Sequence, residues 1–198
     1  ILTIGYEHIT PDTLAARAKA LGAIVVDCRS SVARTKAGFG KRQLATLLGD
    51  DGYTWQGAIL GGRGEGVTPA GVEWLRAENR AREGQGVNLL LLCQEGAPGE
   101  CHRHHQIAGP HFPDALHLYD PGEGDDAVEV VTARELTRAL AADDVDYART
   151  GWADLIAGQG LDEWRPPARG LAGTDGGKIL PSGRIARMMA ARRLGGGA

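Results

Sequence analysis

The residues best suited to chemistry lie between positions 93 and 103 of this 198-residue chain. Cys93 and Glu95 precede a loop rich in glycine and proline, and the loop ends at Cys101, His102 and Arg103. A thiol pair, a carboxylate, an imidazole and a guanidinium so close together can supply a nucleophile, an acid or base, and an anion clamp. The sequence therefore places a candidate site here.

Cys101 is the candidate nucleophile of this group. We expect a helix to begin at Cys101, and both the helix dipole and the charge of Arg103 would favour its thiolate. His102 is the candidate proton carrier, and Glu95 completes the predicted catalytic set. For Cys28 and Cys93 the simpler interpretation is that they are small core residues, because free cysteine is among the most buried residue types.

A zinc site is an alternative, because Cys28, Cys93, Cys101 and a histidine could supply a tetrahedral set. The intervening loop, however, is longer than the roughly two to four residues between cysteines in common zinc motifs. The chain also lacks the Cys-x-x-Cys pair of the zinc deaminases, although Cys93 and Glu95 imitate part of their signature. We therefore assign no metal ligand, and the cofactor stays unknown.

Two arginines are candidates for holding an anionic group. Arg29 and Arg103 could each bind a carboxylate or phosphate with two parallel hydrogen bonds. The competing interpretation is an internal ion pair with Asp27, Glu95 or Glu100.

Glycines 61, 62, 64 and 66 would let the backbone approach a ligand closely. Their spacing is not Gly-x-Gly-x-x-Gly, and no Walker lysine follows. We therefore do not expect ordinary dinucleotide or ATP binding.

Short apolar runs alternate with helical patterns over residues 1–120. Runs near 2–4, 23–27, 53–55, 87–93 and 115–119 predict strands, and the segments between them carry helix signals such as Thr10-Pro11 and Thr68-Pro69. This alternation predicts an α/β fold, a three-layer Rossmann-like or flavodoxin-like domain with a mainly parallel sheet of about five strands. Parallel strands present their carboxyl ends at one edge, so Cys28, Arg29, Cys93 and residues 101–103 should converge there.

The chain beyond residue 120 has a different texture. Residues 121–164 read as an acidic helical extension of two helices, with Thr132 and Glu135 forming a capping box, and residues 165–198 as a basic tail rich in Gly, Pro and Arg. The net charge is −9 over residues 120–163 and +6 over residues 165–198. Either the regions have different tasks, or the acidic segment neutralises the tail. We expect the tail to be dispensable for folding and to add to any nucleic-acid affinity.

Composition is that of a globular protein, with 42% hydrophobic residues and a net charge of −3. No apolar run approaches the roughly 20 residues of a membrane span, and no basic-then-apolar leader precedes the first strand. Three cysteines make no disulfide framework. We expect a cytoplasmic protein without membrane partners.

Several motifs occur together in a familiar order. They are Thr3-Ile4-Gly5-Tyr6-Glu7, Val26-Asp27-Cys28-Arg29, Leu60-Gly61-Gly62, Leu92-Cys93-Gln94-Glu95 and Cys101-His102-Arg103. The set resembles the family catalogued as domain of unknown function 488 (DUF488), over about residues 1–120. Cys28 departs from it, because a small aliphatic residue is expected between Asp27 and Arg29.

The resemblance implies the fold and the site but no established activity. The implied site residues are Gly5, Tyr6, Asp27, Arg29, Gly61, Gly62, Cys93, Glu95, Cys101, His102 and Arg103.

Three functions compete on these observations. The first is an enzyme that acts on a phosphorylated, nucleotide-like or nucleic-acid substrate through Cys101, His102 and the two arginines. The second is a non-catalytic module in which the basic loop after Cys28 and the arginine tail bind nucleic acid. The third is a thiol redox or metal site. The partner is an anionic small molecule or a nucleic acid, and the oligomeric state is left open.

Overall fold

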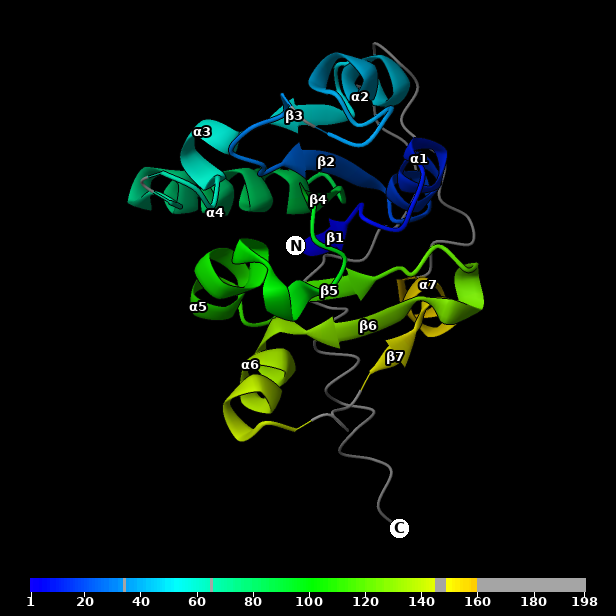
Figure 1. The fold of residues 1–198 in the computed structure, drawn as a ribbon, viewed down its shortest axis with the longest axis vertical. Helices are drawn as coiled ribbons and strands as arrows, with labels where there is room; N and C mark the ends of the chain where they lie inside the picture. Colours follow the sequence, from blue (N-terminus) through cyan, green and yellow to red (C-terminus); the bar gives the residue numbers. More distant parts are fainter. Residues whose placement is uncertain (34, 65, 145–148, 160–198) are drawn as a thin grey trace.

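The computed structural model describes residues 1–33, 35–64, 66–144 and 149–159 (Figure 1). Within them a seven-stranded sheet has the order β3-β2-β4-β1-β5-β6-β7. The strands are β1 (Leu2–Gly5), β2 (Ala23–Asp27), β3 (Tyr53–Trp55), β4 (Asn88–Cys93), β5 (Leu116–Tyr119), β6 (Glu129–Thr132) and β7 (Thr150–Gly151). The first five strands are parallel, whereas β6 and β7 are antiparallel to their neighbours.

Strand β4 lies in the interior of the sheet, between β2 and β1. All six of its residues are buried, because helices cover both faces. An unbroken apolar run is what such a position requires. Its last residue, Cys93, lies beside the ends of β1 and β2, so the loop that follows emerges where several strands finish.

Helices form a layer on each face of the sheet (Figure 1). One face carries α1, α2 and α7, whose side chains pack around Ile4, Leu90 and Leu92. The other carries α3 and α4, whose Leu60 and Leu75 pack against Leu89 and Leu91. The helices are α1 (Pro11–Ala20), α2 (Lys41–Leu48), α3 (Gly57–Leu60), α4 (Pro69–Glu83), α5 (Gly109–His111), α6 (Ala133–Ala142) and α7 (Trp152–Gln159).

The predicted helix starts are confirmed at three threonines. The hydroxyls of Thr10, Thr68 and Thr132 each accept a hydrogen bond from a backbone N–H three residues further on, which caps α1, α4 and α6. The α/β fold with a mostly parallel sheet is likewise confirmed.

The sheet is larger than the sequence indicated, because the chain after residue 120 adds two strands. We expected two helices there, and α6 and α7 are present. Residues 129–132, however, form β6, which pairs with β5. Thr132 ends this strand and also caps α6, so the helix signal was placed correctly while the strand before it was missed.

The predicted basic tail, residues 165–198, lies outside the described residues. Within the described ranges, no helix has the length and apolar character needed to cross a bilayer.

Candidate functional site

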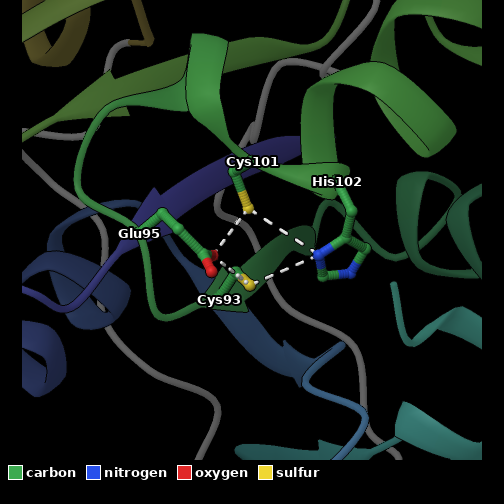
Figure 2. A group of neighbouring side chains, drawn as sticks. All are labelled: Cys93, Glu95, Cys101 and His102. Carbon is green, nitrogen blue, oxygen red and sulfur yellow. Dashed lines mark hydrogen bonds between the residues drawn. The ribbon is translucent and has the colours of Figure 1, made fainter. Parts of the chain in front are cut away.

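Four side chains that can ligate a metal converge after the end of β4 (Figure 2). They belong to Cys93, Glu95, Cys101 and His102, and their ligand atoms all lie within 4.8 Å of one another. In Figure 2 the two sulfurs, the carboxylate and the imidazole point toward a common centre. Both cysteines are buried, and the other two residues are half-buried.

The two thiols share one carboxylate oxygen. Cys93 Sγ and Cys101 Sγ each lie 3.0 Å from Oε2 of Glu95, and each donates to it. They lie 3.6 Å and 3.8 Å from Nδ1 of His102. The four groups therefore form a closed ring of contacts.

His102 is held in place by the atoms on its other side. Its Nε2 lies 3.2 Å from the carbonyl oxygen of Cys28 and 3.1 Å from that of Leu60. Two carbonyls can only accept, so Nε2 carries a proton, and in its neutral form the ring presents the lone pair of Nδ1 to the sulfurs. Gly62 packs directly on this ring, because a Cβ there would lie 2.3 Å from His102 Cγ.

The surroundings hold both thiols in the protonated form. The hydrogen bond with Cys93, followed by burial, raises the pKa of Cys101, and these effects exceed the lowering by His102 and Arg103. For Cys93, Cys101 lowers the pKa, but contacts with Cys28, burial and Glu95 raise it by more.

The carboxylate and the imidazole shift in the directions their partners impose. Burial alone would raise the pKa of Glu95, but the thiol donors outweigh it and the pKa is lowered. Burial alone would lower the pKa of His102, yet its contacts with Cys101, Leu60 and Glu95 raise it. Glu95 therefore keeps its charge as the common acceptor of the cluster.

The loop between the two cysteines is shaped by close backbone packing. Gly5 makes this possible, since a Cβ there would lie 1.8 Å from the carbonyl oxygen of Glu95. A 3-10 helix, Pro98–Glu100, then leads into Cys101, and a π-helix, Arg103–Ala108, follows His102. A π-helix often marks a functional site, and this one buries Arg103 directly behind the cluster.

Arg103 acts as the anchor of this loop. Its fully buried guanidinium donates to the carbonyl oxygens of Glu95 and Gly96 and to the hydroxyl of Thr3. No carboxylate pairs with it among the described residues. Its donors are thus committed to holding the backbone that carries Glu95.

Arg29 belongs to a separate buried cluster with Asp27 and Tyr6. Its Nε and Nη2 donate to the two oxygens of Asp27 at 2.8 Å and 2.6 Å, as in the ion-pair interpretation of the sequence. Burial would lower the pKa of Arg29, but Asp27 outweighs it and raises the pKa. The ring of Tyr6 stacks on Phe39 and faces this guanidinium. This cluster packs on the α1 and α2 face, whereas the cysteines pack on the α3 and α4 face.

Two buried histidines, His104 and His117, form a pair of their own. His104 and His117 are buried and share a hydrogen bond of 3.0 Å, and His117 reaches the hydroxyl of Thr3 at 2.7 Å. Burial lowers the pKa of His104 to about 4 and also lowers that of His117. Both rings are therefore neutral at pH 7.

The predicted convergence at one edge of the sheet is confirmed for Cys28, Cys93 and residues 101–103, whereas Arg29 packs with Phe39 on the other face. Cys93 and His102 meet in the cluster, and the carbonyl of Cys28 contacts the same imidazole. Gly61 packs against Ser30, so the glycine pair serves close packing of loops around His102.

The prediction of a thiolate at Cys101 is wrong, because the pKa of this thiol is raised and not lowered. Cys101 is buried and faces the carboxylate of Glu95, while its backbone N–H already donates to Pro98. The helix expected at Cys101 begins only at Arg103, and the lowering of the Cys101 pKa by His102 and Arg103 is outweighed by the contact with Cys93 and by burial.

Sequence reasoning found all four members of the cluster but not their arrangement. Cys28, included in the zinc set considered from the sequence, instead donates its thiol to the carbonyl of Leu92 at 3.1 Å. Glu95 takes the fourth position. Four donors within ten residues were the available signal, but the long loop between the cysteines concealed it.

Comparisons with known proteins give no relative: no family model, no curated protein and no solved structure matches this chain.

Proposed function

We propose that the chain binds a divalent transition metal, with Zn²⁺ the best fit, through Cys93, Glu95, Cys101 and His102. The orientation of His102 supports this most directly. Its Nε2 is engaged by two carbonyls, and its Nδ1 faces two sulfurs and a carboxylate. Metal-ligating histidines almost always donate their second ring nitrogen in this way, which fixes the tautomer.

The distances suit a tetrahedral centre. Ordinary zinc bond lengths put a sulfur and a nitrogen ligand about 3.5 Å apart at tetrahedral angles. The two S–N distances are 3.6 Å and 3.8 Å. The two S–O distances of 3.0 Å are shorter, so the Glu95 carboxylate has to retreat by roughly 0.5 Å.

The charges also suit a dication. Two thiolates, one carboxylate and Zn²⁺ sum to −1, and the buried guanidinium of Arg103 behind the loop offsets that charge. Loading exchanges two thiol protons for one dication, so the buried charge does not change. An uncompensated buried charge would raise the free energy of the folded state strongly.

The ligand set is closed, as in structural zinc centres, and the exchangeable ligand is Glu95. If Glu95 moves aside, a position opens at which a metal can polarise an anionic substrate. This open form would suit the enzyme acting on an anionic substrate that we expected from the sequence. The resemblance to DUF488 stays a prediction. A route through free Cys101 thiolate is less favourable, because its thiol is buried and its pKa is raised.

A dithiol redox pair is the second candidate. Cys93 and Cys101 donate to the same oxygen, so their sulfurs are neighbours. Forming a disulfide would release two protons and two electrons to an oxidant such as glutathione disulfide. Metal binding would block this reaction, so one experiment can distinguish the two.

The test is metal content in purified protein and its variants. We expect one Zn²⁺ per chain after loading and dialysis, and a thiolate-to-metal charge-transfer band when Co²⁺ replaces it. Cys93→Ser, Cys101→Ser and His102→Gln should each lose the metal. Cys28→Ser is the matched control: Cys28 contacts Cys93 but is not one of the four converging ligands, so this variant should keep the metal.

Two results would contradict metal binding. One is equal metal content in Cys28→Ser and Cys101→Ser. The other is a Cys93–Cys101 disulfide that forms equally fast with and without zinc, which would favour the redox pair.

A further inference from the structure

A groove is lined in part by the loop that carries the candidate site. It has a volume of about 390 Å³ and lies between residues 97–100, β6 and α6. Pro98, Val131 and Leu136 line it but are themselves buried. Leu140 also lines it and is 48% exposed, one of two large apolar residues of the described part of the chain that are exposed. Leu140 is thus the large aliphatic residue of the groove that the described residues leave open to a partner.

The rim of the groove is acidic. Glu100 and Asp143 are exposed, and neither forms an ion pair within the described part of the chain. The other charged lining groups are already paired, Glu129 with Arg149 and Asp144 with Arg138. An apolar groove flanked by two available carboxylates suits a partner that presents apolar side chains between cations.

The chain itself contains such a segment beyond its described part. Residues 184–194 read Arg-Ile-Ala-Arg-Met-Met-Ala-Ala-Arg-Arg-Leu, with four arginines and no acidic residue. The whole stretch from 165 to 198 carries a net charge of +6, opposite to the −9 of residues 120–163. Sequence and groove are therefore complementary both in charge and in apolar character.

We propose that residues 184–194 of the same chain bind in this groove, with apolar side chains on Leu140 and arginines beside Glu100 and Asp143. Reach is sufficient. The 24 residues between Gln159 and Arg184 can span about 80 Å when extended, roughly twice the diameter of about 40 Å expected for a compact domain of this size. The proposal does not depend on metal binding, but the bound segment would contact the loop between Glu95 and Cys101.

The test is photo-crosslinking in the full-length protein. p-Benzoylphenylalanine is placed at Met188 in one sample and, as the matched control, at Leu171 in another. After illumination and digestion, mass spectrometry should find crosslinks from position 188 to residues 97–100 or 131–144 of the same chain. Position 171 should give none there.

Charge reversal provides the second arm. Arg187→Glu combined with Arg192→Glu should abolish the crosslink from position 188, whereas Arg165→Glu combined with Arg169→Glu should leave it. Three results would overturn the proposal: no crosslink to the groove, the same crosslink from position 171, or crosslinks that join two copies of the chain.

Discussion

The thiols of Cys93 and Cys101 must lose their protons before they can bind a metal. Their surroundings raise both pKa values, so each carries its proton at pH 7. A bound dication would replace those two protons. Metal affinity is therefore expected to respond strongly to pH.

We predict that two protons leave for each zinc ion bound at pH values above the raised pKa of His102. The apparent affinity should fall roughly 100-fold for each pH unit lost, because two protons compete with one metal ion. Below the raised pKa of His102 a third proton leaves from Nδ1, and the fall becomes steeper. Titration calorimetry in buffers with different heats of ionisation counts the protons. A proton count near zero would contradict the two-thiolate centre.

Single residues were the part of the site that the sequence predicted best. Cys93, Glu95, Cys101 and His102 follow directly from residue type and place in the chain. Their protonation was predicted poorly, because it depends on burial and on the shared contact with Glu95. Neither the burial of the thiols nor their contact with Glu95 can be read from the sequence, because both arise only when the loop folds.

Loops rather than strands fix the orientation of His102. Gly62 lies against its ring, and the carbonyls of Cys28 and Leu60 hold its Nε2. Only a residue without a side chain fits at Gly62.

We predict that Gly62→Ala weakens zinc binding by at least about 10-fold, the range found when the groups supporting a metal-ligating histidine are disturbed. The new Cβ would come within 2.3 Å of His102 Cγ, so the ring has to turn. Chelator competition measures the change. Gly158→Ala is the control, because a Cβ there meets nothing within 4 Å. Equal affinities in the two variants would show that the ring position does not matter.

Elements were predictable from the sequence wherever one signal dominated. The buried run of β4 and the Thr-Pro starts of α1 and α4 are such cases. Strand β6 was missed because its four residues precede a strong helix cap, and pairing with β5 decides its structure. The 3-10 and π turns around Cys101 depend likewise on tertiary contacts, such as those of Arg103.

At the scale of the molecule, Arg17 connects helix α1 to the segment of the described chain that follows residue 119. It lies on α1, and its Nε donates to Asp120 at 2.8 Å, while its guanidinium lies 4.3 Å from the ring centroid of Trp152 on α7. Both partners follow β5 in the sequence. The segment after residue 120 is therefore bound to the parallel part of the fold through buried polar contacts.

We predict that Arg17→Ala lowers the free energy of unfolding by about 3–5 kcal/mol, because it leaves Asp120 buried without its partner. Arg134→Ala removes an ion pair with Asp114 whose members are both 68% exposed, and should cost less than about 1 kcal/mol. Urea unfolding at pH 7 compares the two. Similar losses in the two variants would contradict a larger contribution of the buried Arg17–Asp120 pair to the free energy of unfolding.

The compactness of the ligand set also bears on the order of events during synthesis. All four candidate ligands lie between residues 93 and 102, and their supports at Thr3, Cys28 and Leu60 come earlier in the chain. Proteins emerge from the ribosome amino terminus first. The nascent chain therefore holds the complete ligand set, with β1 to β4 already made, while β5, β6 and β7 are still to be translated. The metal binding that we propose would therefore use only residues that are translated before β5.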